Sequence, residues 1–283
     1  MAYDINWIIP KLRKPGAFWN CASSLTIAFV GIVTKVITGV KTRAPLGWLN
    51  QTTVHNREMM EKMFKRSEST PLITISNHHS CFDDPGLWGP LKVRYLCSRK
   101  NLRWALTAHD ICFTNLIHSV FFSLGKCIPV VRGTGVNQPA IDFAIEQMGL
   151  GAWLHVFPEG RVNMTKEEMR LKWGVGRIIY ESPRTPLVVP IWHEGMDEVL
   201  PNTEPYMFRF RKKITLNYGE PIHVEEIVQR LRKKEATPEE ARKVITDYLQ
   251  EKLYNLRDET LKLLSNNNQD QLSNNCTTSQ KDL

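Results

Sequence analysis

Short apolar runs that end in polar turns recur along the middle of this chain. They have the length and the β-branched content of buried strands, and they occupy residues 72–76, 127–131, 152–157, 186–192 and 213–218. Apolar residues with helical spacing follow Pro139, and they appear again after Thr237, where Thr-Pro-Glu-Glu forms a capping box. Strands that alternate with helices in this way predict an α/β fold built on one sheet.

The N-terminal segment has a different pattern. No charged residue occurs from Pro15 to Thr34, directly after the basic Lys11, Arg13 and Lys14. The run approaches the roughly 20 apolar residues that span a bilayer, but Gly, Asn, Ser and Thr dilute it, which favours a shallow membrane anchor over a clean span. A secretory signal or a buried core helix would share the basic start and the apolar run.

These patterns divide the chain into three parts. Residues 1–45 are expected to form a membrane-associated helical segment, residues 46–265 the folded domain, and residues 266–283, rich in Asn, Gln and Ser, a disordered tail. The apolar stretches 173–179 and 187–192 are candidates for a second membrane surface, although burial in the core explains them equally well.

Charge and cysteine content narrow the functional classes. A net charge of +8 and a pI near 9.2 favour a polyanionic partner, which charge alone leaves open as nucleic acid or an anionic lipid surface. The six cysteines form no CxxC pair and no cluster with histidine, so no metal site is expected. The sequence also contains no Gly-rich nucleotide loop of either common kind.

The polar turn after residues 72–76 contains the candidate chemistry. His78 and Asp83 have four residues between them, a spacing that would turn their side chains about 140° apart on a regular helix. A bend, with Asp84 as N-cap and Pro85 in the first helical position, would bring the pair together. The imidazole could then take a proton from an alcohol while the carboxylate fixes its tautomer. Because His and Asp are common in loops, a structural role for both stays open.

Two other strands end in side chains that could join this turn. Arg132 follows one strand and is shaped to clamp a phosphate with two parallel hydrogen bonds, and Glu159 follows another. Ligands of α/β sheets gather at the carboxyl ends of strands, so we expect His78, Arg132 and Glu159 to converge. The basic and aromatic residues between 88 and 104 could also bind phosphates, although a solvated basic face is the commoner explanation.

Four sequence blocks, in this order, resemble the four motifs of the glycerolipid acyltransferase superfamily. The blocks are Asn77-His-His-Ser-Cys-Phe-Asp83, Ile128-Pro-Val-Val-Arg-Gly133, Phe157-Pro-Glu-Gly-Arg161 and Val188-Val-Pro-Ile191. Within that superfamily the chain is most similar to the mitochondrial phospholipid–lysophospholipid transacylases. Segments outside the blocks carry this closer likeness, among them Asp110-Ile-Cys-Phe-Thr114, Lys172-Trp-Gly-Val-Gly-Arg177 and Val199-Leu-Pro-Asn202. The resemblance implies a mixed α/β sheet flanked by helices.

The resemblance also selects the catalytic pair. The superfamily form Asn-His-x-Ser-x-x-Asp places Ser80 correctly only if His78 and Asp83 are the pair, which leaves His79 as a neighbour that packs locally. His78 would then remove the proton from a lysophospholipid hydroxyl, which attacks the ester carbonyl of a donor phospholipid without a cofactor. Attack by His78 itself, to give an acyl-histidine, stays open.

The remaining motif residues are implied to bind substrate. Glu159 and Gly160 would line the glycerol side of the site, while Arg132 and Arg161 would hold phosphate. Many lysophosphatidate acyltransferases have Thr after the Gly of the third block, where this chain has Arg161. Substrate details of those enzymes therefore do not transfer directly.

The resemblance implies partners and a location as well. Phospholipid and lysophospholipid would be the substrates, in an anionic, cardiolipin-containing bilayer, with no nucleic acid. The protein would be a peripheral or monotopic protein of mitochondrial membranes that faces the intermembrane space, although the N-terminus is not Arg- and Ser-rich like an import signal. The alternatives are an acyl-coenzyme A-dependent lysophospholipid acyltransferase and a non-enzymatic basic module that binds membrane surfaces or nucleic acid. The sequence does not indicate an oligomeric state.

Overall fold

A computed structural model describes residues 3–39, 49–96 and 101–279 of the chain. Seven strands in this part form one sheet, in the order β1-β7-β6-β2-β5-β3-β4. All neighbouring strands are parallel except β6 and β7, so the sheet is mixed, as expected. The strands are β1 (Gln51–His55), β2 (Leu72–Ser76), β3 (Arg103–Ala108), β4 (Cys127–Val130), β5 (Trp153–Val156), β6 (Leu187–Glu194) and β7 (Lys213–Tyr218).

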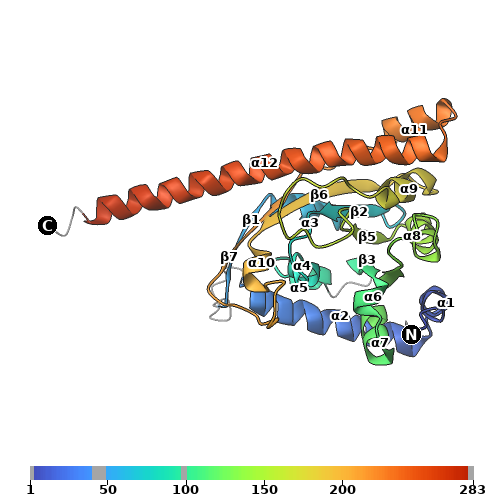
Figure 1. The fold of residues 1–283 in the computed structure, drawn as a ribbon, viewed down its shortest axis with the longest axis horizontal. Coiled ribbons are helices and arrows are strands. Elements are labelled where there is room, and N and C mark those ends of the chain that lie inside the picture. Colours follow the sequence, from blue (N-terminus) through green and yellow to red (C-terminus); the bar gives the residue numbers. More distant parts are fainter. Residues whose placement is uncertain (1–2, 40–48, 97–100, 280–283) are drawn as a thin grey trace.

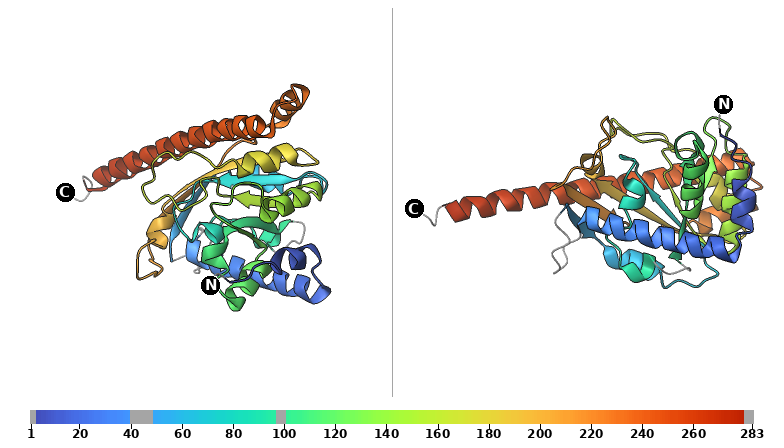
Figure 2. Two further views of the ribbon diagram at one scale, coloured as in Figure 1. Left: turned by 45° about the vertical axis from the view of Figure 1, so that its right-hand side comes forward. Right: turned by 90° about the horizontal axis from the view of Figure 1, so that it is seen from below.

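Helices flank the sheet (Figure 1). They are α1 (Ile8–Arg13), α2 (Ala17–Thr38), α3 (Arg57–Met63), α4 (Asp83–Gly86), α5 (Val93–Leu96), α6 (His109–Cys112), α7 (Leu116–Leu124), α8 (Pro139–Gly149), α9 (Gly174–Glu181), α10 (Met196–Val199), α11 (Glu225–Lys233) and α12 (Pro238–Ser279). The long α12 packs against α9 and β6, whereas α2 lies on the opposite side of the molecule, against α4, α5 and α7. Figure 2 shows α2 running across the underside.

The sheet is buried on both faces, which explains why its strands read as nearly continuous apolar runs. Ile73 and Ile75 of β2 belong to the core that includes residues of α8, α9 and α12. Leu72, one position earlier, belongs to a second core with residues of α3 and α10. This alternation fixes the register of β2 because a slip by one residue would exchange the two sets.

Two strands were not predicted from the sequence. β1 is short and lies at an edge of the sheet, while β3 lies between β4 and β5. In the described part of the basic and aromatic stretch between residues 88 and 104, Lys92 and Arg94 are exposed, as a solvated basic face requires. Trp88 and Trp104 are instead buried and Arg103 is mostly buried, so they do not belong to such a face. Residues 97–100 of that stretch lie outside the described residues.

The apolar stretches 173–179 and 187–192 do not form a second membrane surface. Val175, Ile178 and Ile179 are fully buried under α12, and Trp192 belongs to the same core. The expectation was wrong because apolar composition is the same for a strand or helix in the core and for one at a bilayer. Only the packing of α12 over α9 and β6 distinguishes them.

The N-terminal segment is helical, and α2 is not a buried core helix. Phe18, Leu25, Phe29 and Ile32 of α2 are exposed. In the part of the chain that the structure describes, α2 is the one helix long and apolar enough to cross a membrane, with a mean hydropathy of 1.7, although this rests on length and composition alone. The boundary expected at residues 45 and 46 lies outside the described residues.

The C-terminal segment differs from the expectation of a disordered tail after residue 265. α12 continues to Ser279 and projects past the folded body (Figures 1 and 2). Residues 266–279 contain neither Pro nor Gly, so nothing in the backbone ends the helix before Ser279. Polar composition predicts the absence of packing, but it does not by itself exclude helical backbone.

Candidate active site

The turn after β2 brings His78 and Asp83 together. The Nδ1 atom of His78 lies 2.9 Å from Oδ2 of Asp83, at the start of α4. This hydrogen bond fixes the tautomer with the proton on Nδ1 and leaves Nε2 as the nitrogen that can accept one. The ring of Phe157 stacks on the imidazole with 4.0 Å between ring centroids, so the orientation of His78 is held from two sides.

Asp83 is fully buried and serves as the centre of the turn. Its Oδ2 atom accepts hydrogen bonds from the backbone N–H groups of His79, at 2.6 Å, and Ser80, at 2.9 Å. Burial disfavours the charged carboxylate, but the charge and hydrogen bonds of His193 and His78 outweigh this and hold the pKa of Asp83 well below its usual range. Asp83 is therefore ionised at neutral pH and stabilises an imidazolium on His78.

The expectation that His79 packs locally is confirmed. His79 is buried, it contacts the side chain of Asn77, and its ring lies edge-on to that of Trp192. Burial, followed by repulsion from His193, lowers its pKa to about 4. A neutral, enclosed imidazole of this kind is suited to packing rather than to proton transfer.

His193 is a member of the site that the sequence did not reveal. It lies at the end of β6, 116 residues after Asn77, and its Nε2 atom is 3.1 Å from the Asn77 carbonyl oxygen and 3.4 Å from Oδ2 of Asp83. Although burial opposes it, the charge of Asp83 raises the pKa of His193. The only sequence signal is a histidine at the end of a predicted strand, since its nearness to Asp83 depends on the pairing of β2 with β6.

The expectation about Asp84 and Pro85 is corrected. α4 begins two residues earlier than expected, at Asp83 with Phe82 as N-cap, and Asp84 has non-helical backbone angles. The Asp84 carboxylate instead accepts a hydrogen bond from Nε1 of Trp88, at 3.0 Å, and pairs with Arg103 of β3. A side chain that bridges α4 to the sheet is not available to cap a helix.

One large cavity is lined by His78 and by the four residues that were expected to bind substrate. Its volume is about 1030 Å³, at the upper end of the range usual for small-molecule sites. The carboxyl ends of β2, β4 and β5 contribute its polar lining, as the parallel sheet requires. Helix α2 contributes Thr26, Ile27, Val30 and Gly31 to the opposite wall. The expected residues in its lining are His78, Arg132, Glu159, Gly160 and Arg161.

Glu159 is buried beside His78. Its Oε1 atom accepts a hydrogen bond from the backbone N–H of His78 at 3.3 Å, while Oε2 has no partner among the described residues. Burial raises the pKa of Glu159 to about 7, although hydrogen bonds from His78 and Asn163 oppose the shift. Gly160 follows with φ +74°, a conformation that favours glycine, and a side chain there would approach Cγ of Lys172 at 3.0 Å.

The two arginines expected at the site lie at its open side. Arg132 is half-exposed and forms an ion pair with Asp110 of α6, and Arg161 is exposed. Arg103, which the sequence did not suggest as part of the site, also lines the cavity while paired with Asp84. The cavity therefore has guanidinium groups at both a buried and an exposed position, and such groups suit phosphate.

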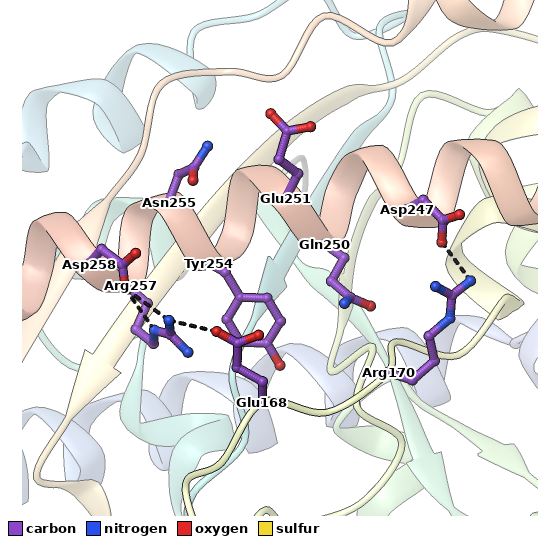
Figure 3. A pocket seen from close by; sticks show the side chains of 9 residues that line it. All are labelled: Glu168, Arg170, Asp247, Gln250, Glu251, Tyr254, Asn255, Arg257 and Asp258. Atoms are coloured by element: carbon purple, nitrogen blue, oxygen red, sulfur yellow. Dashed lines mark hydrogen bonds and ion pairs between the residues drawn. The ribbon is translucent and has the colours of Figure 1, made fainter.

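Helix α12 holds the loop that follows Glu159. Tyr254 accepts a hydrogen bond from the N–H of Met169, at 2.7 Å, and donates one to its carbonyl oxygen, at 3.0 Å. Gln250 accepts one from the N–H of Leu171, at 3.0 Å. Figure 3 shows both side chains reaching from α12 toward the loop. Ion pairs of Arg170 with Asp247 and of Glu168 with Arg257 flank them.

No group of three metal-ligating side chains occurs among the residues that the structure describes. The cavity is lined by four arginines, Arg103, Arg132, Arg161 and Arg170, and by His78, whose hydrogen bond occupies the Asp83 carboxylate. These residues are suited to proton transfer and anion binding.

Comparisons with known proteins agree with the fold and the motifs. Residues 51–194, about half of the chain, match the protein family described as Acyltransferase. Tafazzin of Drosophila melanogaster is 53% identical over 264 residues, which cover 93% of this chain and 68% of the fly protein. The Dictyostelium discoideum protein named Taffazin is 38% identical over 192 residues, which cover 65% of this chain and 67% of that protein.

A solved structure supports the fold independently. The 1-acyl-sn-glycerophosphate acyltransferase PlsC of Thermotoga maritima superposes with a TM-score of 0.51 and 16% sequence identity, covering 84% of this chain and 96% of that chain. At this identity the likeness concerns the fold alone. The family match and the identity to the fly protein confirm the superfamily and the closer resemblance inferred from the motif blocks. The chain is an acyltransferase, and it belongs to the tafazzin branch of the acyltransferase family.

Proposed function

We propose that this enzyme moves acyl chains from a phospholipid to a lysophospholipid without coenzyme A. The observation that carries the proposal is the His78–Asp83 pair, 2.9 Å apart, in the wall of a large cavity whose opposite wall is the apolar α2. Such a cavity offers a proton acceptor beside a space suited to acyl chains.

The reaction needs one base and no cofactor. Nε2 of His78 takes the proton from the free hydroxyl of the lysophospholipid, and the hydroxyl oxygen attacks the ester carbonyl of the donor. The tetrahedral intermediate collapses by breaking the bond to the donor's glycerol oxygen, which takes the proton back from His78. Asp83 stabilises the imidazolium in between, and the donor leaves as a new lysophospholipid. Since one ester is exchanged for another, the reaction is nearly isoenergetic and reversible.

The remaining residues in the cavity wall position the two lipids. Arg132 and Arg161 bind phosphate at the open side, where guanidinium groups remain partly hydrated. Glu159 and Gly160 line the space next to His78, where the glycerol must lie for its hydroxyl to reach Nε2. Positioning is the main demand, because the enzyme must bring the hydroxyl of one lipid and the ester carbonyl of another to one base.

The domain organisation follows from the same proposal. Residues 1–45 attach the enzyme to a membrane as a peripheral or monotopic protein, and residues 46–265 form the acyltransferase domain. Membership of the tafazzin branch supports mitochondrial membranes as the location, with cardiolipin and its lyso form as natural products. The protein would face the intermembrane space.

Donor choice tests the proposal directly. Purified protein in liposomes is given monolysocardiolipin and labelled linoleoyl chains, supplied either on phosphatidylcholine or on coenzyme A. We expect transfer from phosphatidylcholine without any thioester, and its loss in His78→Ala. Transfer from the thioester alone would instead identify an ordinary lysophospholipid acyltransferase, because the same base serves both donors. Binding to anionic vesicles with no acyl movement from either donor would identify a non-enzymatic membrane-surface protein.

A further inference from the structure

His193 is anchored to Asn77, the residue that precedes the candidate base. The side chain of Asn77 donates to the carbonyl oxygen of His193 at 2.9 Å and accepts from its N–H at 3.0 Å. The Nε2 atom of His193 lies 3.1 Å from the Asn77 carbonyl oxygen, and a carbonyl oxygen can only accept a hydrogen bond. Nε2 of His193 therefore carries a proton, on the side of the ring that faces the turn after β2.

Asp83 lies between two histidines. Its Oδ2 atom is 2.9 Å from Nδ1 of His78 and 3.4 Å from Nε2 of His193. His78 lines the cavity, whereas the side chains of His193 and Asp83 are fully buried. Within the described part of the chain, these two histidines are the only basic side chains within ion-pair distance of Asp83. Any positive charge that balances Asp83 must therefore come from one of them.

The chemistry of the transfer decides which histidine carries this charge. An ionised carboxylate in the protein interior needs a nearby opposite charge. His78 must be neutral before the reaction, because it accepts the proton of the lysophospholipid hydroxyl. His193 is closed off from the cavity and can keep its proton throughout. Although burial opposes it, the charge of Asp83 raises the pKa of His193.

The other histidines around His193 do not share this charge. The ring of His79 is 5.5 Å from that of His193 between centroids, and His155 faces it from β5. Burial lowers the pKa of His79 to about 4 and the pKa of His155 well below its ordinary value, and repulsion from His193 adds to both shifts. On β7, His193 pairs with the apolar Leu216. Both neighbouring imidazoles are therefore neutral at neutral pH.

Two further carboxyl groups face His193 from other positions. Glu194, the next residue of β6, forms an ion pair with Lys166 at 3.4 Å, which offsets its charge. Burial raises the pKa of Glu159, in the loop after β5, to about 7, although the charge of His193 opposes the shift. Among the described residues, Asp83 is the one carboxylate within ion-pair distance of His193. The two form a buried ion pair directly behind the candidate base.

We propose that His193 is a positioning residue that stays protonated throughout the transfer and neutralises Asp83, so that His78 begins each cycle as a neutral base. A carboxylate without a second cation would stabilise an imidazolium on His78 before the lipid hydroxyl arrives. The cation behind Asp83 limits this effect, while the hydrogen bond to Nδ1 still orients the ring. The role of His78 rests on the proposed function, but the protonation of His193 does not.

A pH profile tests the effect on His78. The variant His193→Gln keeps an N–H donor for the Asn77 carbonyl oxygen but has no charge. We expect the acid limb of kcat/KM for acyl transfer in liposomes to move to higher pH by about one pH unit or more, because Asp83 then acts unopposed on His78. His79→Gln, the same change at the adjacent buried histidine, is the matched control and should leave the limb in place. A lower rate with an unshifted limb in His193→Gln would show a purely structural contact and overturn the proposal.

Nitrogen NMR measures the protonation of His193 without any turnover. The protein, labelled with ¹⁵N in its eight histidine rings, is recorded in detergent at about pH 7.5, where an ordinary imidazole is neutral. We expect one imidazolium signal to persist in the wild type and in His78→Ala, and to be lost in Asp83→Asn. The proposal is overturned by a wild type without such a signal, by its loss in His78→Ala, or by its survival in Asp83→Asn. This measurement decides the question even if His193→Gln does not fold or the donor lipid is not the proposed one.

Discussion

The backbone N–H of Asn163 donates a hydrogen bond to the carbonyl oxygen of His78 at 2.6 Å. This bond joins the loop after β5 to the turn after β2, so the segment that contains Glu159 and Arg161 is tied directly to the candidate base. Asn163 also donates from its side chain to the Glu167 carbonyl oxygen at 2.8 Å. The backbone position of the loop and that of His78 therefore depend on each other.

The first prediction concerns the choice between the two adjacent histidines. His78→Ala and Asp83→Ala should each lower acyl transfer by roughly 10²- to 10⁴-fold, because each removes part of a positioned acid–base pair. His79→Ala should mainly lower stability, since that side chain is buried and hydrogen-bonded. Rates are measured in liposomes and normalised to folded protein by circular dichroism. An inactive His79→Ala beside an active His78→Ala would reverse the assignment.

The second prediction is that Glu159 makes the protein less stable as pH rises. Its pKa is about 7 in the folded protein against an ordinary 4.5, so the folded state binds more protons between these values. The free energy of unfolding should therefore fall from about pH 4.5 to 7, by about 1–3 kcal/mol. His79, with its pKa lowered to about 4, has the opposite effect between about pH 4 and 6.5.

The variant Glu159→Gln separates these two contributions. It has no charge to bury, so its stability relative to wild type should increase between about pH 4.5 and 7. Urea unfolding over that range in detergent measures the difference, and Glu251→Gln, which alters an exposed carboxylate on α12, is the control. Parallel curves for wild type and Glu159→Gln would show that Glu159 has an ordinary pKa.

The third prediction concerns the contact between α12 and the loop after β5. Tyr254→Phe removes the hydroxyl that binds both backbone groups of Met169, which should cost about 1–2 kcal/mol of stability. The loosened loop lines the cavity through Arg170 and Leu171, so KM for lipid should rise more than kcat falls. Tyr248→Phe, on the same helix, is the matched control, and equal kinetics for both variants would contradict a positioning role.

The fourth prediction concerns α2. Phe29→Ser combined with Ile32→Ser should weaken attachment to anionic vesicles by about tenfold or more, because both side chains are exposed and neither lines the cavity. Sedimentation with vesicles measures it, with Leu150→Ser combined with Leu261→Ser as the control. Point variants are preferable to deleting the N-terminus, since Ile8 and Leu12 of α1 are buried in the core. Equal binding by both double variants would exclude α2 as an anchor.

The sequence determined the elements whose signals are local. β2 and β7 begin and end at the predicted residues, because β-branched apolar runs stopped by polar or Gly-containing turns have few alternatives to a buried strand. The motif Asn-His-x-Ser-x-x-Asp determined which histidine pairs with Asp83. The order of the strands' polar ends also predicted that His78, Arg132 and Glu159 line one cavity, because the carboxyl ends of parallel strands lie along one edge.

Only the tertiary structure decided features that depend on residues far apart in the chain. His193 approaches Asp83 because β6 pairs with β2, and Arg103 reaches Asp84 because β3 is placed inside the sheet. The apolar residues of α9 and of α2 are similar in kind, yet α12 covers one set and leaves the other exposed. The composition of a segment gives the chemical type of its side chains. Their burial and their contact residues depend on packing between segments far apart in the chain, which no local sequence pattern specifies.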